Sequence, residues 1–129
     1  MNPPIFVNVT TNPKDPNSAR EVVRYDQFVR RLMKAQSESL EACHIALGLA
    51  GEAGELGDAI KKEYIYGKKR DIDNVIEELG DIEWYLQAAY THYGLDRHGV
   101  IQANATKLEV RYAGLVYSDE AAQARADKA

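Results

Sequence analysis

Two long stretches of the chain share one pattern, in which a pair of acids three residues apart borders an apolar helical stripe. Glu52 and Glu55 lie in the first stretch, and Glu78 and Asp81 lie in the second. Because a helix advances about 100° per residue, the two acids of each pair lie about 60° apart. The apolar residues of each stretch fall in a sector beside the acids, at the spacing of a helix face that packs. The pattern therefore predicts two amphipathic helices that meet along these faces.

Glycine recurs at every third position of the first stretch, as Gly48, Gly51, Gly54 and Gly57. Each glycine inside a helix destabilises that helix by about 1 kcal/mol relative to alanine. Gly54 and Gly80 occupy equivalent places, two residues after the first acid of each pair. Small residues allow a helix or a ligand to approach the backbone closely. We therefore interpret the glycines as making room for a site between the acids.

Capping and stop signals predict an all-α fold, most simply a four-helix bundle. The four prolines lie in residues 1–17, which we interpret as an irregular N-terminal arm whose stretch IFVNV is compatible with a short strand. The first expected helix begins at Ser18, with a capping box to Glu21, and the second runs from Ser37–Leu40 to about Tyr64. The third runs from after Asp71 or Asp73 to His92 or Tyr93 and stops at Gly94. The fourth, capped by Asp96, runs from Arg97 to about Tyr112, and a short helix follows Ser118. The expected divisions are the arm 1–17, a helical domain 18–115 and a C-terminal tail 116–129.

Net charge, cysteine count and the length of the apolar runs limit the classes of protein to which the chain can belong. Sixteen basic and twenty acidic residues give a net charge of −4, which argues against a nucleic-acid partner because such binding needs a basic face. The single cysteine, Cys43, excludes an internal disulfide and fits a reducing compartment, and its apolar neighbours predict burial. No apolar run is long enough to cross a membrane and no signal-peptide pattern is present, so we expect a cytoplasmic protein.

The four acids predict a metal site. When the two apolar stripes pack together, the pairs can face each other, and four crowded carboxylates need protons or cations. Hard divalent cations bind through oxygen ligands, so Mg²⁺ is the expected ion, with Mn²⁺ as the alternative. A single pair would more simply be a solvated helix face. Two matching pairs, each bordering an apolar stripe, favour a shared site at Glu52, Glu55, Glu78 and Asp81.

These residues resemble the MazG-like all-α nucleotide pyrophosphohydrolases. The resemblance lies in the acid spacing, with residues 56–77 between the pairs, and in the segments ALGLAGEAGELGDAIKK, VIEELGDIEWYLQAAYTHYGL and VIQANATKLEVRY. It implies Mg²⁺-dependent hydrolysis of a nucleoside triphosphate between the α- and β-phosphates, which releases a monophosphate and pyrophosphate. The four acids would hold metal ions, and Asn104, Lys107 and Arg111 would hold the phosphates or sugar. Relatives work as homodimers or homotetramers, and we expect a homodimer at least.

The resemblance supplies no general base, because Gly51 stands where some relatives carry an additional Glu. The basic group of Lys61, Lys62, Lys68, Lys69 and Arg70 is compatible with a contact to the triphosphate tail, or with solvated charge at a helix end. Four aromatic residues suit either base stacking or core packing, and packing is the simpler interpretation for Tyr25, Phe28, Trp84 and Tyr85.

Two other classes of protein compete with this reading. A di-iron carboxylate bundle needs two Glu-x-x-His pairs, whereas only Glu41 and His44 have that spacing here. A non-catalytic helical module that binds nucleotides or regulates a partner would also retain the acids. The intact set of four acids favours the enzyme.

Overall fold

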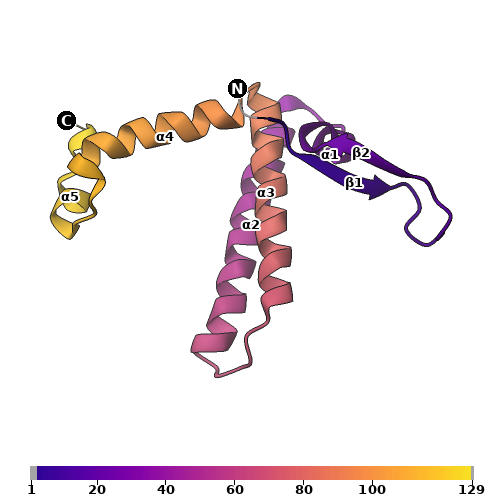
Figure 1. Cartoon of the computed structure of the whole chain (residues 1–129), viewed down its shortest axis with the longest axis horizontal. Coiled ribbons are helices and arrows are strands. Elements are labelled where there is room, and N and C mark those ends of the chain that lie inside the picture. Colours follow the sequence, from indigo (N-terminus) through magenta and orange to yellow (C-terminus); the bar gives the residue numbers. More distant parts are fainter. Residues whose placement is uncertain (1–2, 129) are drawn as a thin grey trace. The chain divides into compact units, whose positions relative to one another are not determined.

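The computed structural model describes residues 3–128, so the first two residues of the predicted arm and the last residue of the predicted tail lie outside it. Its elements are the strands β1 (Phe6–Thr10) and β2 (Arg20–Arg24), the helices α1 (Tyr25–Leu32), α2 (Glu38–Tyr64), α3 (Ile72–Tyr93), α4 (Arg97–Arg111) and α5 (Asp119–Ala124), and the short 3-10 turns η1 (Ala113–Leu115) and η2 (Ala126–Lys128) (Figure 1). The described residues form two compact units, 3–94 and 95–128. They are mostly helical, as expected, but they do not confirm a four-helix bundle. The expected divisions at residues 17 and 115 stay a prediction.

Residues 6–24 form a β-hairpin, whereas the sequence predicted an irregular arm followed by a capped helix. Strands β1 and β2 pair antiparallel, with Val7 opposite Val23, and Val23 is buried. The capping box from Ser18 to Glu21 is wrong, because the Ser18 hydroxyl instead accepts a hydrogen bond from Thr10 Oγ1 at 2.7 Å. The β-branched pair at residues 22 and 23 favours an extended backbone over the start of a helix. Helix α1 consequently begins only at Tyr25.

Helices α2 and α3 form an antiparallel pair whose ends agree with the sequence signals (Figure 1). The Ser37 hydroxyl accepts from the backbone N–H of Leu40, and the Asp71 carboxylate accepts from that of Asn74. Gly94 ends α3 in the left-handed conformation, with φ of 63°, which glycine adopts without a Cβ clash. These caps confirm the predicted bounds of both long helices.

The core of the first unit lies between α1, α2 and α3. Val29, Ile45 and Ala88 are buried there, and partly buried side chains pack around them, including Tyr25, Phe28 and Trp84. Core packing is therefore confirmed for these three aromatic rings.

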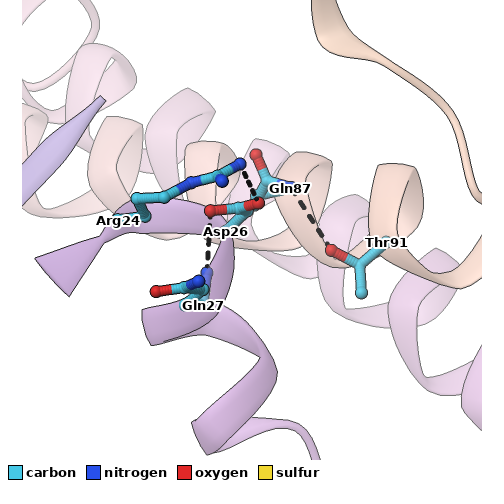
Figure 2. A network of polar contacts seen from close by, with 5 residues as sticks. All are labelled: Arg24, Asp26, Gln27, Gln87 and Thr91. Atoms are coloured by element: carbon cyan, nitrogen blue, oxygen red, sulfur yellow. Dashed lines mark hydrogen bonds and ion pairs between the residues drawn. The ribbon is translucent and has the colours of Figure 1, made fainter. Parts of the chain in front are cut away.

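Figure 2 shows polar contacts at the junction of the hairpin and α1, where Arg24 Nη2 donates to Asp26 Oδ2 at 2.9 Å. On α3 in the same view, Gln87 donates to Thr91 Oγ1 at 3.3 Å.

Only one glycine of the acidic stretch is in close contact with another element of the described chain. A Cβ built on Gly48 would lie 2.2 Å from the ring of Tyr85, whereas one built on Gly51, Gly54, Gly57 or Gly80 would meet nothing within 4 Å. Gly48 thus lets α2 approach α3. For Gly54 and Gly80, no contact among residues 3–128 supports the interpretation that they permit a close approach.

Replacing Gly48 with alanine is expected to lower the melting temperature, because the added methyl group displaces the Tyr85 ring and overpacking usually destabilises by about 1–3 kcal/mol. Gly57→Ala is the matched control, since it lies about 180° around the same helix and faces open space. That control should instead gain up to about 1 kcal/mol from helix propensity. Thermal denaturation measures both, and equal shifts for the two variants would contradict the assignment.

The second unit consists of α4 and the segment that follows it. The Asp96 carboxylate caps α4 by accepting from the backbone N–H of Gly99, and the Ser118 hydroxyl caps α5 by accepting from that of Ala121, so both predicted caps are confirmed. Helix α5 and the turn η2 lie against α4 (Figure 1). Within residues 3–128, no helix combines the length and the apolar character that crossing a membrane requires.

Candidate metal centre

Three carboxylates from two helices meet on the α2–α3 pair. Glu52 and Glu55 lie one turn apart on α2, and Glu78 lies on α3. One carboxylate oxygen from each lies within 4.8 Å of the other two. The antiparallel packing produces this arrangement, because it sets the acidic border of one helix beside the acidic border of the other. A set of carboxylate oxygens at this separation suits a hard divalent cation.

Glu78 is the most unusual member of this carboxylate cluster. Its side chain is only 7% exposed, although charged residues are rarely buried without a partner. Burial raises the pKa of this carboxyl above its ordinary value, and the negative charges of Glu55, Glu52 and Glu77 raise it further. An energetic conflict of this kind, in which like charges crowd around a buried acid, is typical of functional sites. A divalent cation would relieve it.

In the described structure, the Asp81 carboxylate does not lie within the cluster of Glu52, Glu55 and Glu78. It lies one turn after Glu78 on α3 and is exposed. Its negative charge is close enough to Tyr25 on α1 to contribute, after burial and Glu83, to the raised pKa of that phenol. The described side chains therefore bring together three of the four predicted acids, and the role of Asp81 stays a prediction.

The predicted phosphate-binding residues lie on α4, in the second unit. Asn104 and Lys107 are exposed, while Arg111 is partly buried. Arg111 Nε donates to Asp127 Oδ1 at 2.7 Å, and Arg111 Nη2 donates to Asp127 Oδ2 at 3.0 Å. The structure brings Arg111 together with Asp127 on the turn η2.

Asp127 is a residue that the sequence did not single out. It lies sixteen positions after Arg111, in the alanine-rich segment that was predicted to be the C-terminal tail. The paired guanidinium lowers the pKa of the Asp127 carboxyl to about 2. The one available signal was the capping residue Ser118, which predicted a helix in this segment but not its docking on α4.

The contacts of neighbouring residues bear on several of the predictions. Lys61 and Lys62 pair with Asp58 at 3.3 Å and 3.0 Å, and Arg70 pairs with Glu63 at 2.9 Å, as expected for charges solvated near a helix end. The prediction that Cys43 is buried is wrong for the described chain, in which this residue is exposed on α2. Of the apolar residues near it, Ile45 is buried in the core, whereas Leu40 and Leu47 are exposed like Cys43.

The Glu41 and His44 pair does not form a metal site. Glu41 Oε1 lies 2.6 Å from His92 Nδ1 across the α2–α3 interface, and His44 Nδ1 lies 3.1 Å from Gln36 Nε2. The two residues of the Glu-x-x-His spacing therefore have different partners, which removes the support for a di-iron bundle. Tyr85 packs against Gly48 and the edge of Trp84, so packing accounts for this fourth aromatic ring as well.

Comparison with known proteins gives two matches. The family model of the MazG nucleotide pyrophosphohydrolase domain matches residues 41–115, more than half of the chain. The chain is also similar to the Gene 37 protein of Mycobacterium phage L5, with 34% identity over 77 residues, which are 53% of this chain and 63% of that protein. The chain thus spans less than two thirds of the length of this relative. No solved structure matches the chain.

Proposed function

We propose that this chain, which belongs to the MazG nucleotide pyrophosphohydrolase family, is a Mg²⁺-dependent enzyme that cleaves nucleoside triphosphates between the α- and β-phosphates. The observation that carries the proposal is the carboxylate cluster of Glu52, Glu55 and Glu78 within the matched residues. Mn²⁺ is the alternative ion. The single cysteine supports a cytoplasmic setting for this activity.

In this reaction the oxygen of a water molecule adds to one of the two phosphorus atoms of the anhydride between the α- and β-phosphates. The bridging oxygen leaves with the other phosphate, and the proton released from the water passes to solvent. The products are a nucleoside monophosphate and pyrophosphate. When bound, the divalent cation would neutralise phosphate charge and lower the pKa of water. The role of Glu52, Glu55 and Glu78 is to hold that cation in fixed geometry, and Asp81 would complete the set from the next turn of α3.

Recognition of the triphosphate is assigned to α4. Lys107 and Arg111 are four residues apart and therefore lie on one face of the helix, and Asn104 lies one turn earlier. Ammonium and guanidinium groups suit phosphate oxygens, and guanidinium in particular binds them in a bidentate manner. Lys107 and Asn104 are exposed, which supports their availability to a ligand.

The direct test is to incubate the purified full chain with Mg²⁺ and a panel of canonical and damaged nucleoside triphosphates and to measure pyrophosphate. Release of pyrophosphate from at least one nucleotide, abolished by chelation with EDTA, supports the proposal. Release of inorganic phosphate instead would indicate cleavage at the γ-phosphate and would contradict the proposed bond. If no nucleotide is cleaved, the alternative of a non-catalytic nucleotide-binding or regulatory module is favoured.

Asp81→Asn is expected to lower turnover by about a hundredfold or more without changing the fold, since the lost charge belongs to the metal set and the side chain is exposed. Asp73→Asn is the matched control, because it is another exposed acid on α3, but it lies in the first turn. Steady-state rates with the preferred nucleotide and circular dichroism check the two variants. A wild-type rate for Asp81→Asn would remove this residue from the site.

The exposed face of α2 supports a homodimer. Leu40, Cys43, Leu47, Ala50 and Gly54 recur at alternating steps of three and four residues, and each of them is exposed. Leu47 is 73% exposed in the described chain. Such spacing is the seam along which one helix packs on another, and a second copy of this chain would cover it. Cys43 would then become buried, and the open side of Gly54 would be occupied.

Light scattering of the purified chain is expected to give the mass of a homodimer or homotetramer, and Leu47→Glu is expected to shift it to a monomer by placing a charge in the seam. The Cys43 thiol should react more rapidly with a water-soluble thiol reagent in that variant than in the wild-type chain. Lys68→Glu, in the loop after α2, is the matched control and should stay oligomeric. A wild-type mass equal to one chain would contradict the proposal.

A further inference from the structure

The contact between Arg111 and Asp127 bears on how the proposed phosphate site is built. The two side chains are 17% and 2% exposed, so the pair is largely withdrawn from water. Both carboxylate oxygens of Asp127 are used, one by Nε and one by Nη2 of Arg111. Charge-assisted pairs of this bidentate kind are short and strongly oriented. The guanidinium is therefore fixed in one orientation by the turn η2.

Asp127 occupies only one edge of the Arg111 guanidinium, the one formed by Nε and Nη2. The other edge is not used by this pair. A guanidinium carries five N–H donors, of which Asp127 takes the Nε–H and one on Nη2. The two donors on Nη1 and the second donor on Nη2 point away from the carboxylate. The hydroxyl of the neighbouring Tyr112 is a further hydrogen-bond partner of this guanidinium. The end-on edge, formed by Nη1 and Nη2, has the geometry that binds a phosphate through two oxygens.

The backbone around Asp127 holds it in place. Arg125 adopts a left-handed conformation that ends α5, and the N–H of Lys128 donates to the carbonyl oxygen of Arg125 at 2.8 Å. Together these contacts close the turn η2 against α4. Asp127 is thus presented from a short, hydrogen-bonded turn, and its side chain is nearly inaccessible to solvent.

We propose that Asp127 is a positioning residue that presents the Nη1–Nη2 edge of Arg111 to the phosphates of the substrate. This inference rests on the proposed role of Arg111 in triphosphate binding. Two other interpretations are physically distinct. In a purely structural role, Asp127 would hold the turn η2 on α4 without affecting the ligand. In a competing role, the carboxylate would occupy Arg111 and have to leave before phosphate binds. The three interpretations predict effects of different sign on substrate affinity.

The experiment compares Asp127→Ala with the wild-type full chain in two assays. The first is KM and kcat with the nucleotide that the panel identifies, and the second is the calorimetric affinity for inorganic triphosphate. Positioning predicts that KM rises and triphosphate affinity falls, each by about tenfold, the lower end of what loss of an orienting partner causes at ligand sites. It predicts little change in kcat, because the lost contact is made in the ground state as well. Asp127→Glu, which keeps the carboxylate, should recover part of the affinity, and Asp127→Asn should recover less.

Two further variants make the test specific. Asp119→Ala is the matched control, since Asp119 lies in the same segment and accepts instead from the Tyr117 hydroxyl, and it should leave KM unchanged. In an Arg111→Ala background, Asp127→Ala should have no additional effect on KM or triphosphate affinity, because there is no guanidinium left to orient. Equal effects of Asp127→Ala in both backgrounds would overturn the proposal.

The outcomes separate this inference from the proposed activity. An unchanged KM for Asp127→Ala, with a lower melting temperature, would establish the structural role and overturn positioning. A lower KM or tighter triphosphate binding for Asp127→Ala would establish the competing role and would likewise overturn the positioning role. If the wild-type chain binds inorganic triphosphate and Asp127→Ala weakens that binding, but no nucleotide releases pyrophosphate, the inference holds and the proposed activity fails. If it neither binds triphosphate nor cleaves nucleotides, both fail.

Discussion

Replacing Glu78 with glutamine is expected to lower turnover by at least about a hundredfold and, at the same time, to stabilise the metal-free chain. Turnover is expected to fall because the cluster loses its buried carboxylate, a proposed ligand of the cation, and charge stabilisation by a bound cation is worth several kcal/mol in phosphoryl chemistry. The measurement is the rate of pyrophosphate release, together with thermal denaturation in EDTA.

The gain in stability follows from the direction of the Glu78 pKa. Because the pKa is raised in the folded chain, protonation of Glu78 favours folding, and this stabilisation is lost as the pH rises through the folded-state pKa. Above its folded-state pKa, Glu78 carries an unfavourable buried charge, which glutamine lacks. The stability advantage of Glu78→Gln should shrink as the pH falls and the wild-type carboxyl takes up its proton.

Glu77→Gln provides the matched control for this prediction. Glu77 is the preceding residue on the same helix, carries the same charge, is exposed and lies outside the carboxylate cluster. It should retain near wild-type turnover. If Glu77→Gln lost as much activity as Glu78→Gln, the effect would come from the general negative field rather than from a ligand, and the assigned site would be wrong.

Addition of Mg²⁺ is expected to raise the melting temperature of the wild-type chain. A ligand that binds only the folded state, at a hundred times its dissociation constant, stabilises it by about 2.7 kcal/mol. For a chain of this size that corresponds to a rise of roughly 10 °C. Binding also removes the repulsion among Glu52, Glu55 and Glu78, so a large share of the gain should disappear in Glu55→Gln. Differential scanning fluorimetry with increasing Mg²⁺ measures the effect.

Sodium chloride at matched ionic strength controls for general screening of the negative chain, and it should give a much smaller shift. Glu77→Gln should respond to Mg²⁺ like the wild type. A wild-type melting temperature that does not change with Mg²⁺ or Mn²⁺ would contradict the metal centre, whatever the activity assays show.

Helix bounds were predictable where a local signal decides them. Asp96 and Ser118 cap the helices for which they were predicted, and Gly94 ends α3. Ser37 caps the helix that was expected to begin near Ser37–Leu40, and Asp71 is the cap among the two candidates Asp71 and Asp73. A cap satisfies backbone groups within one turn, so its effect is contained in neighbouring residues. The same kind of signal was misleading at Ser18, because strand pairing with residues 6–10 outweighed it. Such pairing depends on residues far along the chain and is not encoded at Ser18 itself.

The sequence alone determined the helical periodicity, the spacing of the acid pairs and the family to which that spacing belongs, because these can be identified from residue types and their separation along the chain. Only the tertiary structure decided which acids meet. The packing of α2 on α3, with Gly48 against Tyr85, brings Glu78 to Glu52 and Glu55 and leaves Asp81 outside the group. It likewise decided that Asp127 pairs with Arg111. Contacts between distant residues depend on how whole elements dock, and the docking is set by the sum of many small packing energies rather than by a local motif.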